Sequence, residues 1–282
     1  MTMTPTALRS VLFVPASNRR AIEKARTLAC DAVILDLEDA VGPDDKVAAR
    51  EVMASVIPAA GFTAPLVAVR VNGDDTDWAR DDLRAAAAAG PDAVLIPKVA
   101  SVRELMTARA ALPHTIRLWA NIETCLGVLE ARDIAAAALQ VGLDVLVFGQ
   151  NDLSRDLGRR PSRDRRLLHT AMGLTVLAGR AAGLGLVDGV FNDFTDLDAF
   201  EAECREGKAF GFDGKAVIHP AQIDLANQLF SPGEDDLAWA QAIVDAFADP
   251  ANAGKGAVRA SGGMAERLHL DQARRMLASS SR

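Results

Sequence analysis

The sequence predicts a (β/α)₈ barrel, and three observations support that fold. Apolar strand-like segments alternate about eight times with helix-like segments rich in Ala, Leu, Glu and Arg. The strand-like segments show no polar alternation, as expected of strands that are covered on both faces. No Gly-rich dinucleotide fingerprint follows the first strand, which favours a barrel over a doubly wound open sheet. A barrel of about this length is commonly one domain.

The expected strands span residues 10–15, 32–37, 66–71, 93–97, 118–122, 145–148, 184–187 and 215–218. The expected helices include 18–29, 81–89, 102–111 and 164–182. We therefore assign residues 1–230 to a catalytic barrel. Residues 231–282 form an extension with a possible short strand pair at 257–264 and a helix through 274–277. Such an extension either covers the mouth of its own site or reaches a neighbouring subunit.

The composition excludes several classes of protein. Half of the residues are hydrophobic, and 31 basic against 38 acidic residues give a net charge of −7, which argues against nucleic-acid binding. Three cysteines, Cys30, Cys125 and Cys204, show no metal-like spacing and indicate reduced thiols. The first residues lack an apolar signal core, and no apolar run is long enough to span a bilayer. We expect a cytoplasmic protein without membrane contact.

Two carboxylates follow two successive expected strands. Glu123 comes directly after the fifth strand, and Asp152 follows the sixth. Loops after parallel strands gather at one face of a barrel, where barrel enzymes hold their active sites. Two carboxylates there would repel each other unless a cation lay between them, and oxygen ligands suit Mg²⁺. Alternatively, Glu123 could cap a helix that starts near Thr124, and Asp152 could be an ordinary loop acid.

Further charged residues end the second, third and fourth strands. The second strand ends in Asp36-Leu37-Glu38-Asp39, although loop acids and a helix cap would also account for these residues. Arg70 ends the third strand among apolar neighbours and must find an anion, because a buried unpaired charge is costly. Its partner is Glu38, a substrate carboxylate or enolate oxygen, or both. Lys98 adds a second cation at this rim.

Three other residues have two interpretations each. The segment after Phe13 leads into a helix that contains Lys24, and N–H groups at that helix start could hold phosphate or thioester oxygens. His219 at the end of the eighth strand could be a general base, but Pro220 after it makes a structural or ligand-shaping role equally compatible. Cys125 could be a nucleophile, but a lone Cys at an apolar helix start is typical of a core residue.

Seven segments in order resemble the citrate lyase β-subunit-like branch of the HpcH/HpaI aldolase superfamily, which includes malyl-CoA and citramalyl-CoA lyases. The segments are 9–15, 35–41, 69–72, 96–98, 122–124, 148–149 with 151–153, and 211–215 with 218–222. The likeness covers nearly the whole chain. Any one segment would be weak, whereas seven in the right order are specific.

The resemblance implies a Mg²⁺-dependent lyase that cleaves a short β-hydroxyacyl-CoA into acetyl-CoA and an α-keto acid through a thioester enolate. It implies that Glu123 and Asp152 ligate Mg²⁺ and that Arg70 binds the keto-acid part. The expected substrate-binding residues also include Phe13, Lys24, Asn151, Ile218 and His219, with Asp36, Glu38 and Lys98 in support. Family members are usually trimers or hexamers, so a homotrimer or hexamer is expected.

The chain departs from the family pattern in its tail and near its start. Acyl-CoA lyases carry a Gly-x-Met-hydrophobic-Asp motif whose Asp is assigned to proton transfer, whereas here Glu266 stands at that position. Asn18 occupies a place where some relatives have a basic residue for CoA phosphates, and Asp39 stands where hydroxy-diacid aldolases have a His. Two alternatives remain open: the β subunit of a citrate lyase complex acting on a carrier-bound citryl thioester, and a malate-synthase-like or thioesterase activity.

Overall fold

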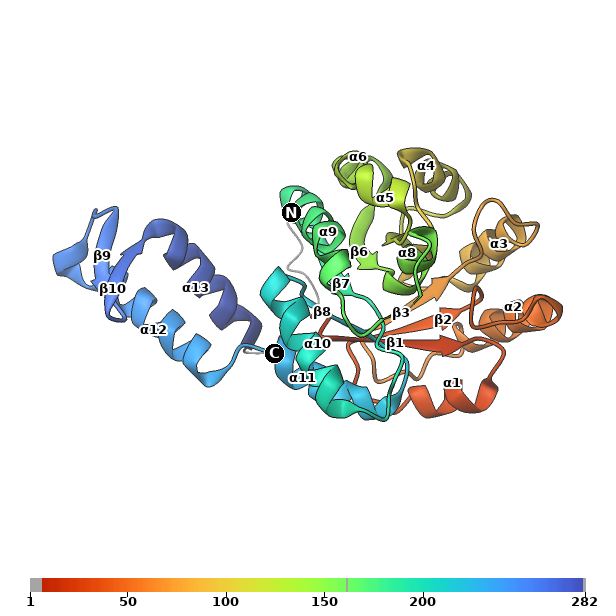
Figure 1. Cartoon of the computed structure of the whole chain (residues 1–282), viewed down its shortest axis with the longest axis horizontal. Helices are drawn as coiled ribbons and strands as arrows, with labels where there is room; N and C mark the ends of the chain where they lie inside the picture. The colour runs from red at the N-terminus through yellow and green to blue at the C-terminus, as the bar shows by residue number, and fades with distance from the viewer. Residues whose placement is uncertain (1–6, 161, 281–282) are drawn as a thin grey trace. The chain divides into compact units, whose positions relative to one another are not determined.

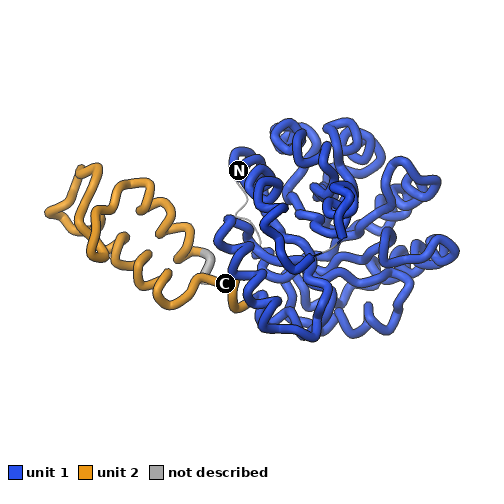
Figure 2. Tube along the Cα trace, viewed as in Figure 1, with its two compact units in different colours: residues 1–227 blue, residues 228–282 orange. Residues whose placement is uncertain are grey.

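The computed structural model describes residues 7–160 and 162–280, and it divides into two compact units (Figures 1 and 2). The first unit covers Met1–Asn227 and the second Gln228–Arg282. The expectation about a signal core at the N-terminus falls on Met1–Thr6, which lie outside the described residues. No helix within 7–160 and 162–280 is both long and apolar enough to cross a membrane.

Eight parallel strands close into a barrel in the order β1 to β8, which confirms the predicted (β/α)₈ fold (Figure 1). They are β1 (Ser10–Pro15), β2 (Ala32–Asp36), β3 (Leu66–Arg70), β4 (Ala93–Ile96), β5 (Arg117–Ile122), β6 (Leu143–Phe148), β7 (Gly185–Asp188) and β8 (Gly214–Val217). Every residue of β2, β4 and β8 is buried, which explains their lack of polar alternation.

Apolar side chains fill the barrel interior, and the strand register then brings charged residues together at the carboxyl ends. The interior cluster includes Val11, Ile34, Leu95, Trp119 and Val147. Asp36 and Arg70, the last residues of β2 and β3, lie opposite each other, and Asp188, the last residue of β7, lies opposite Lys215, the second residue of β8. The packed interior therefore supports a cluster of charge at the carboxyl ends of β2 and β3, and a second pair of charges lies between β7 and β8.

The described helices of the first unit are α1 (Arg19–Ala25), α2 (Lys46–Val56), α3 (Ala79–Ala89), α4 (Val102–Ala111), α5 (Cys125–Leu129), α6 (Ala131–Ala136), α7 (Ala138–Val141), α8 (Gln150–Asp156), α9 (His169–Ala182) and α10 (Leu197–Phe210), and α11 (Ile223–Phe230) runs across the boundary between the units. Helix α1 begins one residue later than expected because the Asn18 side chain caps it, accepting from the Ala21 N–H at 3.0 Å. Helix α9 begins at His169 rather than Asp164, because a 3₁₀ turn at Arg166–Leu168 precedes it.

The second unit contains a helix pair and a short hairpin with their own core. Helix α12 (Glu234–Ala248) packs against α13 (Arg267–Ser280), and β9 (Ala257–Ala260) pairs antiparallel with β10 (Gly263–Glu266). Positive φ angles of 49° at Ser261 and 78° at Gly262 give the two-residue turn that suits the twist of a hairpin. The core of this unit consists of Ala240, Ile243, Val258, Ala265, Leu270 and Ala273. Its role as a lid or subunit-crossing arm stays a prediction.

Candidate active site

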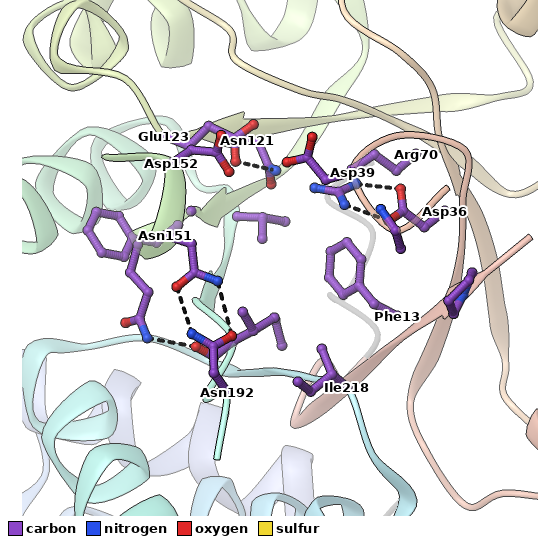
Figure 3. Close-up of a pocket in the computed structure, with 18 residues that line it drawn as sticks. Phe13, Asp36, Asp39, Arg70, Asn121, Glu123, Asn151, Asp152, Asn192 and Ile218 are labelled. Atoms are coloured by element: carbon purple, nitrogen blue, oxygen red, sulfur yellow. Dashed lines mark hydrogen bonds and ion pairs between the residues drawn. The ribbon is translucent and has the colours of Figure 1, made fainter. Parts of the chain in front are cut away.

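A cavity of about 370 Å³ opens at the carboxyl ends of the barrel strands (Figure 3). Of the residues predicted from the sequence, Phe13, Asp36, Arg70, Glu123, Asn151, Asp152 and Ile218 line it. Lys24, Glu38, Lys98, His219 and Glu266 are not among its lining residues. Side chains from segments distant in the sequence therefore meet in one cavity within the first unit.

Arg70 is held in one orientation by two acids and an aromatic ring. Its Nε and one terminal nitrogen donate to the two carboxylate oxygens of Asp36 at 2.7 and 2.6 Å, and the other terminal nitrogen lies 2.9 Å from Glu38 Oε2. The guanidinium carbon lies 5.1 Å from the centre of the Phe13 ring. Burial by itself lowers the pKa of Arg70, but the Asp36 and Glu38 carboxylates outweigh burial and raise it. Arg70 is therefore a fixed, permanent cation.

Asp36 is thus the main partner of Arg70, a role that the sequence alone did not assign. Its carboxylate also accepts from the backbone N–H groups of Glu38 at 2.9 Å and Ala40 at 3.2 Å. Glu38 in turn is bonded to the Lys98 ammonium. Burial raises the pKa of Glu38, while Arg70 and Lys98 oppose that rise. These acids hold the two cations in place at the rim.

Glu123 is nearly fully buried, at 1% exposure, and the backbone around it is shaped to fit its carboxylate. Its Oε1 accepts from the Lys98 backbone N–H at 2.8 Å, and its Oε2 accepts from Asn121 Nδ2 at 2.9 Å. Lys98 has a positive φ of 52°, a strained conformation for a non-glycine residue that is often found at functional sites. A Cβ on Gly149 would lie 2.3 Å from Glu123 Oε2, so only glycine fits there. Thr124, and not Glu123, caps α5.

Asp152 stands in the first turn of α8, and its surroundings neutralise it only partly. Its Oδ1 accepts from the exposed Arg155 at 2.6 Å and lies 3.8 Å from Lys98 Nζ. Burial raises the pKa of Glu123 to about 7, and the charges of Glu38 and Asp152 add to that rise. Figure 3 shows Glu123, Asn121 and Asp152 grouped at one side of the cavity. This side therefore holds negative charge that the protein does not fully compensate.

The donor set fits Mg²⁺. Asn121 Oδ1 is buried without a hydrogen-bond partner among the described residues, beside the Glu123 and Asp152 carboxylates. Within residues 7–160 and 162–280, no group of three or more His, Cys, Asp or Glu side chains is arranged to hold a metal ion. Two carboxylates with positions left for water and substrate are the arrangement that Mg²⁺ prefers over a full protein cage.

Three further candidates, His219, Lys24 and Cys125, are not among the residues that line the cavity. His219 caps the 3₁₀ turn Pro220–Gln222 by accepting from the Ala221 N–H at 3.2 Å, and its ring stacks on Phe194 with centres 4.5 Å apart. Lys24 lies exposed in the last turn of α1. The Asp156 carboxylate raises the pKa of Cys125, which keeps the thiol protonated and argues against a nucleophilic role.

Glu266, the predicted proton-transfer residue, belongs to the second unit. It is the last residue of β10, its side chain is exposed, and its backbone N–H donates to His269 Nδ1 at 2.9 Å. Its catalytic role stays a prediction.

A second cluster of charges, which the sequence analysis missed, surrounds the end of β7 and the second residue of β8. Asp188 accepts from Arg165 at 2.6 and 2.9 Å and from Lys215 at 2.7 Å, and Lys215 also donates to Glu203 at 2.6 Å. Asp188 and Lys215 are fully buried. A Cβ on Gly207 would lie 2.6 Å from Asp188 Oδ2, so this glycine leaves room for the network. These charged residues are buried because they pair with one another, so the apolar pattern of the sequence did not predict their burial.

Known proteins are similar to this chain in sequence over nearly its whole length. The chain is 45% identical over 270 residues to a Cereibacter sphaeroides protein named (3S)-malyl-CoA thioesterase, a match that spans 96% of this chain and 93% of that protein. It is 31% identical over 282 residues to human mitochondrial citramalyl-CoA lyase, across 94% of this chain and 83% of the relative.

Among solved structures, CitE from Mycobacterium tuberculosis in complex with magnesium, acetoacetate and coenzyme A superposes with a TM-score of 0.82 and 29% identity. That match covers 99% of this chain and 100% of CitE. The family described as HpcH/HpaI aldolase/citrate lyase matches residues 9–220. The chain therefore belongs to the HpcH/HpaI aldolase/citrate lyase family.

Proposed function

We propose that the protein is a Mg²⁺-dependent enzyme that hydrolyses a short β-hydroxyacyl-CoA thioester of the malyl-CoA type. The cavity that combines Glu123 and Asp152 with the fixed cation Arg70 supports the binding of a metal ion and a hydroxy-acid thioester, and the likeness to a thioesterase supports hydrolysis. A hydroxy acid offers one carboxylate and one hydroxyl, which match a guanidinium and a metal bound by two carboxylates. The (3S)-malyl-CoA thioesterase from C. sphaeroides supports the choice of thioester.

In this proposal Glu123 and Asp152 hold the metal ion. When bound, the ion acts as a Lewis acid that polarises the oxygens of the hydroxy-acid half. The Lys98 N–H and Asn121 Nδ2 keep the Glu123 carboxylate oriented, since each donates to one of its oxygens. Asn121 Oδ1 is left to accept a hydrogen bond from a molecule in the cavity.

Arg70 binds the substrate carboxylate. Two of its five N–H groups donate to Asp36, and its other terminal nitrogen forms an ion pair with Glu38, so N–H donors remain for a ligand. Because these acids fix the guanidinium before substrate arrives, little side-chain entropy is lost on binding. The apolar residues Phe13 and Ile218 line the cavity apart from the metal-binding carboxylates and accommodate the acyl chain (Figure 3).

Cleavage of the C–C bond is the second candidate function, favoured by the citramalyl-CoA lyase relative. In that reaction malyl-CoA loses the proton of its β-hydroxyl, the bond between the hydroxyl carbon and the thioester α-carbon breaks, and the resulting enolate is protonated to acetyl-CoA. The other product is glyoxylate. Glu266 is the proposed proton-transfer residue, so Glu266→Gln is expected to lower turnover by roughly 10²–10⁴-fold. A loss of less than about threefold would move that role elsewhere.

One experiment separates these functions. The purified protein is incubated with (3S)-malyl-CoA in Mg²⁺ or in EDTA, and free CoA, malate, acetyl-CoA and glyoxylate are measured by mass spectrometry. Hydrolysis gives CoA and malate in equal amounts, whereas C–C cleavage gives acetyl-CoA and glyoxylate. Turnover that persists in EDTA would contradict the metal requirement. Inertness towards all free CoA thioesters, with activity on a carrier-bound citryl thioester, would instead indicate a citrate lyase subunit.

A further inference from the structure

A side pocket of about 170 Å³ adjoins the active-site cavity and shares three lining residues with it. Gln150, Asn151 and Asn192 line both spaces. The side pocket is also lined by Ser154 and Glu203, so polar groups surround much of it. Water occupies roughly 30 Å³ per molecule in the liquid, which gives this pocket room for several water molecules.

Gln150 has one half of its amide fixed and the other half without a partner. Its Nε2 donates to the Val190 carbonyl at 2.6 Å and to Glu203 Oε1 at 3.3 Å. Both of these partners can only accept hydrogen bonds, so the NH₂ group of the amide must face them and the carbonyl oxygen must face the other way. Only 9% of the residue is exposed, and its Oε1 is buried without a hydrogen-bond partner in the described part of the chain. A buried acceptor without a donor is costly, so a molecule in the pocket is the expected donor.

The neighbouring polar side chains are occupied with one another. Asn151 Nδ2 donates to Asn192 Oδ1 at 3.1 Å, and Asn192 Nδ2 donates to Asn151 Oδ1 at 2.9 Å (Figure 3). This reciprocal pair joins the start of α8 to the loop after β7. Glu203 is paired with Lys215 and Arg165. Among these side chains, the carbonyl oxygen of the glutamine amide is the buried acceptor that lacks a partner within the described residues.

We propose that the side pocket supplies the water for thioester hydrolysis and that Gln150 is the positioning residue that orients it. This inference rests on the proposed hydrolytic function. The oxygen of the water forms a bond to the thioester carbon, and the carbon–sulfur bond breaks. One proton of the water ends on the departing CoA thiolate, and the other is lost as the new carboxylic acid ionises. Gln150 takes no proton and acts by accepting a hydrogen bond from the water.

The test compares water with an added nucleophile. Gln150→Met keeps the length of the side chain but removes the acceptor, and Gln150→Leu is the second variant if the first does not fold. Each is assayed with (3S)-malyl-CoA, Mg²⁺ and hydroxylamine, and malate and malyl hydroxamate are quantified after subtraction of the uncatalysed reaction. Gln140→Met, at an exposed position of α7, is the matched control.

We expect Gln150→Met to lower malate formation by roughly 10–100-fold, which corresponds to loss of one hydrogen bond in a buried site. The ratio of hydroxamate to malate should rise at least several-fold, while KM changes little. A variant in which both products fall equally, or neither falls, would overturn the role of Gln150. A wild-type protein that releases no malate would refute the hydrolytic function itself, and the water pocket with it.

Discussion

Two clusters of buried charge lie on the barrel, one at the carboxyl ends of the strands around the cavity and one beside β7 and β8, and they differ in how completely they are neutralised. The open cluster comprises Asp36, Glu38, Arg70, Lys98, Glu123 and Asp152, and the closed cluster comprises Arg165, Asp188, Glu203 and Lys215. In the closed cluster Asp188 and Glu203 each contact both Arg165 and Lys215, and Glu206 adds a further contact to Arg165 at 3.4 Å. In the open cluster Arg70 and Lys98 contact mainly Asp36 and Glu38, whereas Glu123 has no ion pair among the described residues and Asp152 is paired chiefly with the exposed Arg155.

The pKa values of the two central acids express this difference. Burial would raise the pKa of Asp188, but Lys215 and Arg165 outweigh burial and lower it. Burial raises the pKa of Glu123 to about 7, and neighbouring acids add to the rise. Poorly compensated buried carboxylates are concentrated at ligand-binding and catalytic sites, because a bound cation or substrate offsets their charge there. We infer that the closed cluster stabilises the fold and that the open cluster binds a cation and substrate.

The largest expected effect on stability comes from opening the closed cluster. Lys215→Met should lower the free energy of unfolding by about 3–5 kcal/mol, because Asp188 and Glu203 would stay buried without their ammonium partner. Chemical denaturation measures this change. Lys24→Met, at an exposed position of α1, is the control and should change stability by less than about 0.5 kcal/mol. A loss below about 1 kcal/mol for Lys215→Met would contradict the structural role.

Removing a charge from the open cluster should lower activity without lowering stability. Glu123→Gln is expected to lower kcat/KM by roughly 10³-fold, or about 4 kcal/mol, because metal-ion stabilisation of the transition state would be lost. The unfolding free energy of the metal-free protein should stay the same or rise, since a buried charge is removed. Glu51→Gln on the exposed face of α2 serves as the control in the same two assays. If Glu123→Gln lost stability as well as activity, the distinction between the two clusters would be wrong.

Two glycines allow a matched test of moderate size. A new Cβ would lie 2.3 Å from Glu123 in Gly149→Ala and 2.6 Å from Asp188 in Gly207→Ala. Each overpacked contact should therefore cost about 1–3 kcal/mol, as strain or as displacement of the contacted side chain. We expect the first substitution to reduce activity more than stability and the second to reduce stability. Gly173→Ala in α9 has no atom within 4 Å of the new Cβ and should be neutral or stabilising by up to about 1 kcal/mol. Steady-state kinetics and thermal unfolding measure the two effects. A larger loss of stability in Gly149→Ala, or a larger loss of activity in Gly207→Ala, would contradict the prediction.

The smallest expected effect concerns Arg155, which contacts Asp152 but has a side chain that is 69% exposed. Such pairs contribute less than about 1 kcal/mol, because solvent screens them. Arg155→Ala should therefore change activity less than about fivefold, measured at low and at physiological salt. A loss comparable to that of Glu123→Gln would show that Arg155 belongs to the reacting site.

The fold followed from the sequence because its strands are continuous apolar runs. Strand β1 and helix α4 have the predicted bounds, whereas β7 includes Asp188 and was expected to end one residue earlier. A charged residue is normally a reason to end a buried strand. Here the charge of Asp188 is neutralised by Arg165, which is distant in the sequence, and no local pattern reveals such pairing.

The site was predicted in part for the same reason. Glu123, Asp152 and Arg70 follow directly from their positions after strands, and the structure brings them into one cavity. The pairing of Arg70 with Asp36 depends on the β2–β3 register, which the sequence did not specify. The side pocket at Gln150 depends on the loop after β7, and glutamine after a strand carries no signal of its own. Contacts that arise from register and loop packing were therefore those that sequence analysis missed.

Titration calorimetry of Mg²⁺ tests the central claim most directly, with wild type, Glu123→Gln, Asp152→Asn and Gly173→Ala compared in metal-free buffer. We predict one site per chain in wild type and in Gly173→Ala, and no measurable binding in either carboxylate variant. Because a ligand that binds only the folded state stabilises it, wild type alone among the first three should also gain thermal stability with Mg²⁺. Binding that survives in both carboxylate variants, or its absence in wild type, would contradict the account.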